Sequence, residues 1–329
     1  MKRTSDFPYH QVIYERPPCN LCGGINFRNI CKKDRNGLDV NTAVCTTCGL
    51  VSINPRMTPQ WYSKYYQKEY RSQMSWNKGF FDEEIIAKYY TPEKFYHKAR
   101  AYAERIYKKV GEYIRPGLMI EVGSSSGGIL SYFRDTSSVR VLGIEPSVDE
   151  ARYAEGKNIE TVIGLFEEVD KKIEQADTIV CVQSLNHLLS PSEFFRWSYE
   201  HLSPQGRLIV DVVNFEALAR RIAYLEKVVQ IDHVFMFTPR TLRLFAEQAG
   251  FLVLFLNADQ DPKLEHMVMV AEKIPIAKEV VFDTSEAARI TTLPNSYLRF
   301  MVHFGMRRAL KRFFAYVRFF VKKFIKKNK

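Results

Sequence analysis

The sequence predicts an α/β fold in which a doubly wound, mostly parallel sheet is covered by helices on both faces. One observation is the alternation of apolar, strand-like runs with helix-like segments from Leu118 onward. The other is the run LMIEVGSSSGGIL at residues 118–130, which indicates a strand, a turn of Gly and Ser, and a helix that begins at about Gly128. Such a unit places backbone N–H groups and a helix N-terminus around one spot. We therefore expect a nucleotide-like ligand at this turn.

The composition is that of a globular protein. A chain of 329 residues fits about two domains, and 46% apolar and 26% charged residues are ordinary values. No signal-peptide pattern follows Met1, and no run of 18 apolar residues could form a spanning helix, so we expect a cytoplasmic location. Thiols stay reduced in that compartment, so the six cysteines are not expected to form disulfides.

The net charge of +11 is concentrated near the C-terminus. Residues 297–329 hold eleven Lys or Arg and no acidic residue, whereas residues 1–296 hold 37 basic and 37 acidic residues. A protein that binds nucleic acid along its main face normally carries the basic excess on the folded domain. The charge distribution therefore argues against nucleic acid as a partner.

Residues 1–58 are predicted to form a small zinc ribbon. They contain two C-x-x-C pairs, CNLC and CTTC, separated by 22 residues. Two such pairs supply four thiolates that can form a closed tetrahedron around one ion. We expect one structural Zn²⁺ held by Cys19, Cys22, Cys45 and Cys48. The alternative, a pair of redox sites, lacks a thioredoxin-like context, and Cys31 is expected to be a buried apolar residue.

Residues 59–117 are predicted to be a helical segment that covers the sheet. Thr91-Pro92-Glu93 indicates a helix start, with Thr91 as the N-cap, and this helix should run to about Ile114. The many Tyr and Phe side chains of this segment are expected to pack rather than to take part in chemistry.

Further strands are expected after the Gly- and Ser-rich turn. The predicted strands are 139–145, which ends in Glu145, then 176–182, 207–213, 251–256 and 267–271. A turn is expected at 203–206, and Thr238-Pro239 should cap a helix that stops at Gly250.

The turn after the first strand is compatible with two classes of ligand. A dinucleotide pattern G-x-G-x-x-G could be placed on Gly123, Ser125 and Gly128, but that pattern does not require the carboxylate of Glu121. Glu121, followed by Gly123, Ser125 and Gly127, instead resembles the acid-x-G-x-G-x-G loop of class I S-adenosylmethionine-dependent methyltransferases. That family usually has glycine where Ser125 stands. A serine at positive φ costs on the order of 1 kcal/mol, so either the turn differs slightly or the hydroxyl is used locally.

The resemblance to this family extends over residues 118–272. ADTIVCVQSLNHLLSPSEFF is similar to a strand and turn that usually end in Glu-His, here Asn186-His187, and HLSPQGRLIVDVVN is similar to the next strand. The resemblance implies a Rossmann-like, seven-stranded methyltransferase domain over residues 118–275 whose last strand is antiparallel. It also implies that Glu145 accepts the ribose hydroxyls of the cofactor. The implied cofactor contacts are Glu121, Gly123, Ser124, Ser125, Gly127, Glu145 and Pro146.

With its N-terminal ribbon, the chain is similar to a subgroup that includes sugar C-methyltransferases. In those enzymes a histidine preceded by an acid is the general base, and a tyrosine three residues earlier assists. Asp232-His233 matches the acid and the histidine, and Gln230 stands at the tyrosine position. Histidine has a pKa that suits proton acceptance near neutral pH. We therefore expect His233 as the base, oriented by Asp232, with His187 as the second candidate; alternatively, either histidine only shapes its turn.

The expected function is methyl transfer from S-adenosylmethionine to a sugar or to a polysaccharide or lipid-linked glycan precursor, at oxygen or carbon. One alternative is an RNA methyltransferase with a zinc ribbon. The neutral residues 1–296 and the lack of an N-P-P-Y-type loop after residue 182 argue against it. A non-catalytic cofactor-binding module is the other alternative, permitted by Ser125 and Asn186. The sequence indicates neither the acceptor atom nor the oligomeric state.

Residues 276–329 are a predicted C-terminal extension that ends in a basic amphipathic helix. At about 100° per residue, most apolar residues of 297–329 share one side and most Lys and Arg fall on the other. We expect this helix to lie on an anionic membrane surface, which would place the protein peripherally at the inner face of the membrane; the alternative is packing on protein. The predicted apolar side consists of Leu298, Val302, Met306, Ala309, Leu310, Phe313, Val317, Phe320, Val321 and Phe324.

Overall fold

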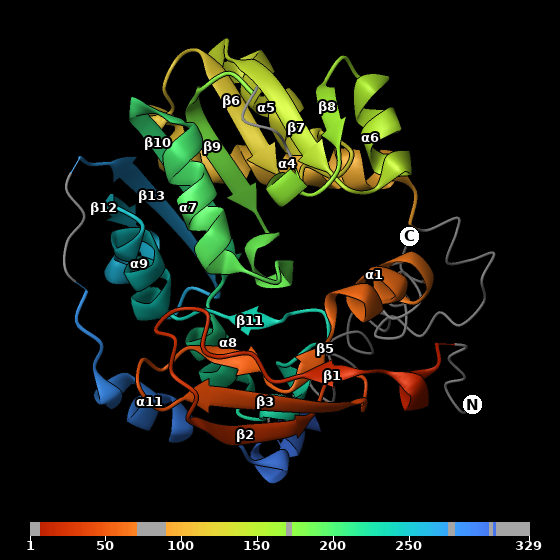
Figure 1. The fold of residues 1–329 in the computed structure, drawn as a ribbon, viewed down its shortest axis with the longest axis vertical. Helices are drawn as coiled ribbons and strands as arrows, with labels where there is room; N and C mark the ends of the chain where they lie inside the picture. The colour runs from red at the N-terminus through yellow and green to blue at the C-terminus, as the bar shows by residue number, and fades with distance from the viewer. Residues whose placement is uncertain (1–6, 71–89, 169–172, 276–279, 303–304, 307–329) are drawn as a thin grey trace, which may run out of the picture.

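The computed structural model describes residues 7–70, 90–168, 173–275, 280–302 and 305–306. A large sheet with flanking helices forms one part of the molecule, and smaller sheets built mainly from the N-terminal residues form the other (Figure 1).

The large sheet has seven strands in the order β12-β13-β10-β9-β6-β7-β8. Strands β10, β9, β6, β7 and β8 are parallel, and β13 is antiparallel to both of its neighbours. This arrangement confirms the predicted α/β sheet of seven mostly parallel strands. Its strands are β6 (Leu118–Val122), β7 (Arg140–Glu145), β8 (Glu160–Ile163), β9 (Ala176–Val182), β10 (Leu202–Val213), β12 (Phe251–Leu256) and β13 (His266–Lys273).

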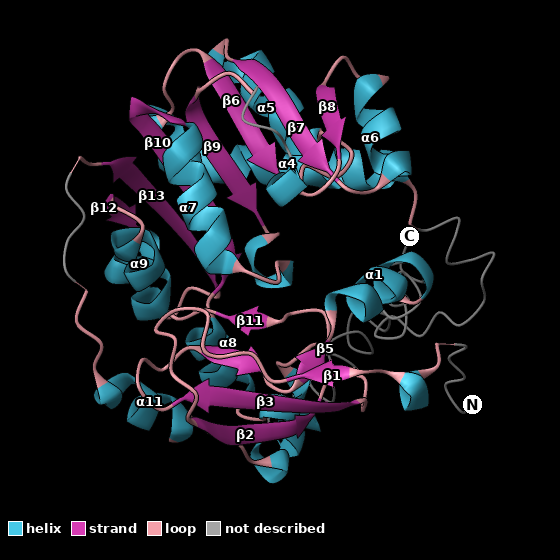
Figure 2. Cartoon of the chain, viewed as in Figure 1, coloured by secondary structure: helices cyan, strands magenta, loops and turns pink. Residues whose placement is uncertain are grey.

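Helices cover both faces of this sheet, as the alternation of strands and helices predicts (Figure 2). On one face, Ile106 and Phe133 pack against Met119 in the sheet. On the other face, Phe194 and Phe245 share a core with Ile120. The flanking helices are α4 (Pro92–Val110), α5 (Gly128–Ser137), α6 (Val148–Glu155), α7 (Pro191–His201) and α9 (Pro239–Gln248).

The predicted helix starts are confirmed by their caps. The Thr91 side chain accepts a hydrogen bond from the Lys94 N–H, and the Thr238 side chain accepts one from the Thr241 N–H. Two details of the sheet differ from the expectation. Strand β8 was not expected, and β10 begins at Leu202, with a register shift before Arg207 where a turn was predicted.

The N-terminal part is a four-stranded antiparallel sheet in the order β11-β4-β3-β2, beside the two-stranded pair β1-β5. Strand β11 comes from far along the chain, since Phe235 pairs with Ser52 and Met236 with Val51. The ribbon sheet is therefore completed by a strand from the part of the chain that carries the large sheet. The strands are β1 (Tyr14–Glu15), β2 (Phe27–Lys33), β3 (Asp39–Cys45), β4 (Val51–Ile53), β5 (Arg56–Met57) and β11 (Phe235–Met236).

The remaining described helices are distributed over both parts. The α-helices are α1 (Pro59–Lys68), α8 (Phe215–Ile222), α10 (Asn257–Gln260) and α11 (Thr284–Thr291). The 3-10 helices are η1 (Tyr9–Gln11), η2 (Gly111–Tyr113), η3 (Phe166–Glu168), η4 (Leu185–His187) and η5 (Leu225–Lys227). Helix α11 lies directly on a cysteine turn of the ribbon, because a Cβ atom at Gly49 would come within 2.3 Å of the Glu286 Cγ.

The described start of the C-terminal segment is helical from Tyr297. The Ser296 N–H donates to the Ala223 carbonyl (2.7 Å), and the Tyr297 ring lies 5.4 Å from that of Tyr224. Most of the predicted basic helix, residues 307–329, lies outside the described residues. In the part of the chain that the structure describes, no helix combines the length and the apolar character needed to cross a membrane.

Candidate functional site

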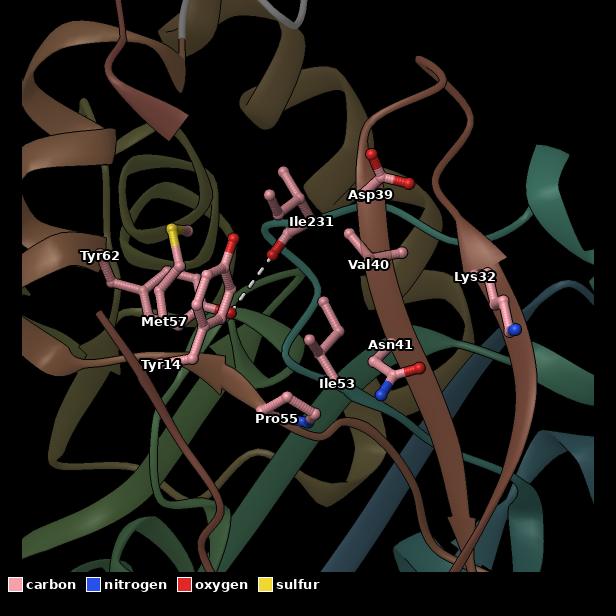
Figure 3. Close-up of a pocket in the computed structure, with 10 residues that line it drawn as sticks. All are labelled: Tyr14, Lys32, Asp39, Val40, Asn41, Ile53, Pro55, Met57, Tyr62 and Ile231. Carbon is pink, nitrogen blue, oxygen red and sulfur yellow. Dashed lines mark hydrogen bonds between the residues drawn. The ribbon is translucent and has the colours of Figure 1, made fainter. Parts of the chain in front are cut away.

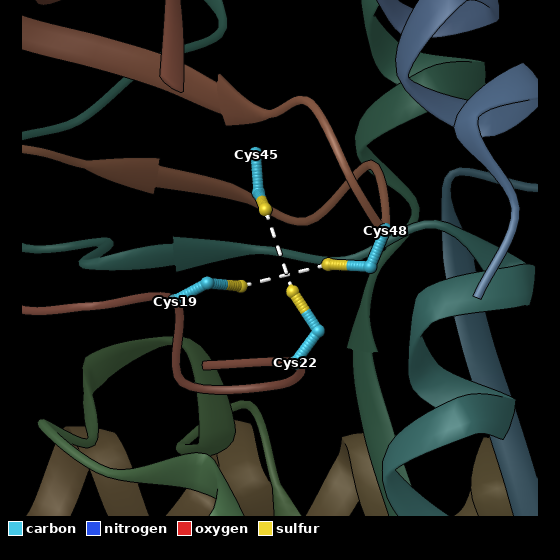
Figure 4. A group of neighbouring side chains, drawn as sticks. All are labelled: Cys19, Cys22, Cys45 and Cys48. Carbon is cyan, nitrogen blue, oxygen red and sulfur yellow. Dashed lines mark hydrogen bonds between the residues drawn. The ribbon is translucent and has the colours of Figure 1, made fainter. Parts of the chain in front are cut away.

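The four cysteines of the two C-x-x-C pairs converge on one point (Figure 4). The Sγ atoms of Cys19 and Cys48 are 3.5 Å apart, and so are those of Cys22 and Cys45. A disulfide would require about 2 Å. A tetrahedron with Zn–S bonds of about 2.3 Å has edges of about 3.8 Å. The four sulfur atoms therefore fit one tetrahedral ion, as the spacing predicts.

Two glycine-containing turns bring these cysteines together. The Gly23 N–H donates to the Cys19 carbonyl and the Gly49 N–H to the Cys45 carbonyl, at 2.8 and 2.9 Å. Both glycines have φ near +75° (73° and 79°), a conformation that costs little only in the absence of Cβ. Cys31 is buried outside the cluster, and its Sγ donates to the Lys33 carbonyl (3.1 Å).

The Gly- and Ser-rich turn follows β6 and leads into α5. The N–H groups of Gly123 and Ser124 both donate to the Ile144 carbonyl of β7, at 2.9 and 3.2 Å. A Cβ at Gly123 would lie 2.5 Å from the Ser184 Oγ, so glycine is required there. Ser125 has φ +48°, and its hydroxyl donates to Glu150 Oε2 (3.3 Å). The serine therefore takes the left-handed conformation and uses its hydroxyl locally.

Glu145 ends β7 directly opposite this turn. Its Oε2 accepts the Ser125 N–H and its Oε1 accepts the Ser147 N–H, both at 2.8 Å. Each carboxylate oxygen has a second lone pair, so both can also accept a ribose hydroxyl. Burial raises the pKa of Glu145, although the two backbone donors act against this. Pro146 lies exposed next to it.

Glu121 is a buried acid with an unsatisfied oxygen. Its side chain is 1% exposed, and its Oε2 has no hydrogen-bond partner among the residues that the structure describes. Burial raises its pKa well above the usual value, and the nearby charge of Glu145 adds to this shift. Buried polar atoms are normally paired, so this oxygen fits a donor from a bound ligand. Together with Glu145 it makes the turn suitable for a nucleoside cofactor.

The structure brings His187, Asp232 and His233 together, and Tyr66 of α1 joins them. The His187 Nδ1 is 3.0 Å from the Asp232 carbonyl oxygen and 3.6 Å from Asp232 Oδ2. The two imidazole rings meet edge to face with centroids 4.8 Å apart. The Tyr66 hydroxyl donates to the Asp232 carbonyl (3.3 Å) and lies 3.1 Å from His187 Nδ1.

The hydrogen bonds assign the protons on the two imidazoles. A carbonyl oxygen only accepts, so His187 carries its proton on Nδ1 and has a free lone pair on Nε2. The Gln230 side-chain N–H donates to His233 Nδ1 (3.4 Å), which places the proton of His233 on Nε2. Burial lowers the pKa of His233 to about 3, although Asp232 acts in the opposite direction. His233 is therefore neutral at physiological pH.

The histidine cluster lies beside the Gly- and Ser-rich turn. The Ser184 hydroxyl, two residues after β9, donates to the Gly123 carbonyl (3.3 Å), and η4 with His187 follows at once. Tyr70 is near both sites. Its ring lies 6.1 Å from that of His187. Burial raises the pKa of Tyr70, and the charges of Asp232 and Glu145 add to this shift. Both sites therefore sit at the carboxyl ends of the parallel strands, where ligands bind in open α/β sheets.

Two cavities adjoin the segment 230–233. The larger, about 310 Å³, is lined mainly by apolar side chains of the ribbon and α1 (Figure 3). At its floor the Tyr62 hydroxyl donates to the Ile231 carbonyl (3.4 Å). The smaller, about 20 Å³, is lined in part by Asn186, Gln230 and His233, and has room for about one water molecule. The larger cavity is lined by Tyr14, Lys32, Asp39, Val40, Asn41, Ile53, Pro55, Met57, Tyr62 and Ile231.

Tyr66 and Ser184 are site residues that the sequence did not reveal. Tyr66 belongs to a segment whose aromatic residues were expected to pack, and it meets His187 across 121 positions of sequence. The spacing along α1 gives no sign of this contact. Ser184 could have been found, since it directly precedes the Leu185-Asn186-His187 turn.

Comparisons with known proteins agree with this geometry. A family model described as a methyltransferase domain matches residues 95–255. A search of curated proteins found no match.

The chain is also similar to solved methyltransferase structures. An S-adenosylmethionine-dependent methyltransferase from Clostridium acetobutylicum is 10% identical, with a TM-score of 0.43 over 52% of this chain and 90% of the other. One from Thermotoga maritima is 18% identical, with a TM-score of 0.44 over 58% and 97%. The CcbJ methyltransferase from Streptomyces caelestis is 18% identical, with a TM-score of 0.42 over 53% and 89%. All three TM-scores are below 0.5, so we base no conclusion on these structures. The matched domain, together with the sheet order, shows that residues 95–255 form a methyltransferase domain and that this chain is an S-adenosylmethionine-dependent methyltransferase.

Proposed function

We propose that this enzyme methylates a hydroxyl oxygen or an acidic carbon of a sugar or glycan precursor. The observation that carries the proposal is the cluster of His187, Asp232 and His233 beside the cofactor turn. A neutral imidazole with a free nitrogen suits an acceptor whose proton must be removed as the methyl group arrives. The charge balance of residues 1–296 fits a small acceptor better than nucleic acid.

Glu121, Glu145 and the turn 123–127 would hold the cofactor. Bound S-adenosylmethionine supplies an activated methyl group on a positively charged sulfur. The protein then has to align the acceptor with that methyl group and to accept one proton. In our proposal Glu145 accepts the ribose hydroxyls and Glu121 accepts an N–H or O–H group of the cofactor.

We assign proton acceptance to His187 rather than to His233. The Nε2 of His187 is free, and the nearby Asp232 carboxylate can stabilise the imidazolium that forms when the acceptor proton is transferred. His233, which the sequence favours, is a weak proton acceptor because burial lowers its pKa to about 3. Its ring packs edge to face on His187, so we assign it a role in positioning that ring.

We further propose that Cys19, Cys22, Cys45 and Cys48 bind a structural Zn²⁺. Four sulfur ligands leave no open position for a substrate or water. The ion would instead hold the ribbon in the form that pairs with β11 and contacts α11.

Transfer of a labelled methyl group to a panel of nucleotide sugars and glycans tests this function. For an acceptor that is methylated, His187→Ala should lower turnover by about 100-fold, the usual contribution of a general base, and leave cofactor affinity unchanged. His233→Ala should lower turnover less, and His97→Ala, at an exposed position of α4, should leave it unchanged. The proposal is wrong if no sugar is methylated, or if His187→Ala keeps full turnover.

A further inference from the structure

The β2–β3 hairpin of the ribbon reaches the histidine cluster through its turn, residues 34–37. The Arg35 N–H donates to the Val229 carbonyl (2.9 Å), and Lys227 Nζ donates to the Arg35 carbonyl (3.2 Å). Val229 is followed by the segment that carries Gln230, Asp232 and His233. The backbone of Arg35 is therefore fixed against the segment 229–233, which contributes residues to the site.

Asp34 stabilises this turn from inside. Its side chain is 1% exposed, and its Oδ1 accepts the N–H groups of Asn36 (2.8 Å) and Leu38 (2.9 Å). The Gly37 N–H donates to the Asp34 carbonyl (2.9 Å). Asx turns of this kind hold a short loop in one conformation, so Arg35 extends from a rigid support.

Among the described residues, the guanidinium of Arg35 has no hydrogen-bond or ion-pair partner. Its residue is half-buried, its Nε is buried without a hydrogen bond, and no carboxylate among the described residues forms an ion pair with it. Arg56, by contrast, pairs with Glu15 (2.8 Å) and Arg207 with Glu272 (2.6 Å). A partly buried charge is normally paired because desolvation is costly. Arg35 is therefore an unsatisfied cation at the edge of the site.

The charge of Arg35 affects the pKa values of two residues in the site. Burial is the main cause of the lowered pKa of His233. Asp232 acts against this shift, and the charges of His187 and Arg35 lower the pKa further. Arg35 also lowers the pKa of Tyr70, against the dominant effect of burial. The guanidinium therefore lies within electrostatic reach of His233 and Tyr70.

We propose that Arg35 binds an anionic group of the methyl acceptor, a carboxylate or a phosphate attached to the sugar. This inference rests on the proposed function and adds the charge of the substrate to it. The planar guanidinium presents several N–H donors in a fixed arrangement that matches two oxygens of either group. The zinc ribbon then contributes directly to substrate choice, because it holds the residue that recognises the acceptor.

Binding to the full chain, saturated with S-adenosylhomocysteine, tests this proposal without a known acceptor. The probes are glucuronate for a carboxylate, glucose 1-phosphate and uridine diphosphate glucose for phosphates, and methyl glucoside as the neutral control. Calorimetry or ligand-observed NMR should show that at least one anionic probe binds and that methyl glucoside binds at least tenfold more weakly. A hydrogen bond to a charged group usually changes affinity by about one to two orders of magnitude.

Three variants separate the role of Arg35 from general effects of charge. Arg35→Met should weaken the anionic probe about tenfold or more, and Arg35→Lys should recover part of this loss because it keeps the charge but not the two-pronged geometry. Arg28→Met, at an exposed position of β2, should leave binding unchanged. Zinc content and affinity for S-adenosylhomocysteine should stay the same in all three.

Two results would overturn the assignment: equal binding of the anionic probe to the wild type and to Arg35→Met, or no preference of the wild type for any anionic probe over methyl glucoside. Neither result concerns methyl transfer itself, so an enzyme that methylates only neutral sugars would contradict this inference and leave the proposed function intact. A protein that binds anionic sugars but methylates no sugar would contradict the proposed function and leave the role of Arg35 intact.

Discussion

At Ser125 the chain takes a φ of +48°, a conformation that glycine adopts more easily than serine. The hydroxyl compensates by donating to Glu150 Oε2, and the Ser125 N–H donates to Glu145 Oε2. One residue therefore links the turn to the carboxylates at the end of β7 and on α6. This coupling means that a change at Glu145 affects both the shape of the turn and the hydrogen bonds to the cofactor.

Replacing Glu145 by alanine should weaken the binding of S-adenosylmethionine by at least tenfold. The variant removes the acceptor for two backbone N–H groups and, in our proposal, for the ribose hydroxyls, and a hydrogen bond to a charged group contributes about 1.5–3 kcal/mol. Calorimetric titration measures the change, with Glu155→Ala, at an exposed position of α6, as the control. Unchanged affinity in Glu145→Ala would remove this residue from the cofactor site.

The pKa of His233 predicts how stability depends on pH. The unfolded chain protonates this imidazole near 6.5, whereas the folded chain does so at about 3 because burial disfavours the charged form. Between these values the unfolded state binds the additional proton, so the free energy of unfolding should fall as the pH drops. From pH 7 to pH 5 the contribution of His233 is at most about 2 kcal/mol.

A comparison of the wild type with His233→Gln isolates this contribution, since other groups titrate alike in both proteins. Urea unfolding at pH 7 and pH 5 should show a smaller loss of stability in the variant. An equal loss in both proteins would mean that folding does not lower the pKa of His233.

The ribbon is the element whose construction departs most from a simple reading of the sequence. Its cysteines lie within residues 19–48, yet its sheet is completed by β11, and α11 covers the Gly49 turn. Thr238, the cap of α9, also donates to Glu286 of α11 (2.7 Å). The cysteine cluster is therefore connected, through α11, to the segment that follows His233.

Removal of the metal should unfold the ribbon and also disturb the histidine cluster. Zinc bound by four thiolates contributes about 10–16 kcal/mol to folding in small domains. Metal analysis should give one zinc per chain, Cys48→Ser should reduce this value, and Cys31→Ser should leave it unchanged because Cys31 lies outside the cluster. Less than half an equivalent of zinc in a folded, reduced wild type would contradict the assignment.

Most elements of the methyltransferase domain could be predicted because their signals are local. The apolar run before Gly123, the cap at Thr238 and the C-x-x-C pairs each depend on neighbouring residues. Strand β8 was missed because its four residues include one exposed position at each end and only one buried side chain. The contacts of Tyr66 and Arg35 could not be predicted, since each depends on which distant segment packs beside it.

At the scale of the whole molecule, the described start of the C-terminal segment is a helix that is attached to the body and carries exposed apolar side chains. Tyr297 and Phe300 pack on Tyr224, whereas Leu298 is 73% and Met306 60% exposed. These two exposed residues belong to the side that the sequence predicts to be apolar. This placement supports the proposal that the segment meets an anionic membrane.

Flotation with liposomes tests this proposal. The full chain should float with anionic but not with neutral vesicles, because each Lys or Arg near such a surface contributes about 1 kcal/mol. A chain that ends at Ser296 should remain at the bottom with both. The same behaviour of the two proteins would leave the segment without a membrane role.

The pairing of β11 with β4 also has a consequence for the synthesis of this protein on the ribosome. Phe235 and Ser52 are neighbours in the ribbon sheet but are separated by 183 positions in the chain. Domains generally fold as the chain emerges, yet the edge of β4 has no partner until translation has passed Met236. An unpaired strand edge invites contact with other chains. The β4 edge of the nascent ribbon is therefore exposed to misassembly until β11 has been synthesised.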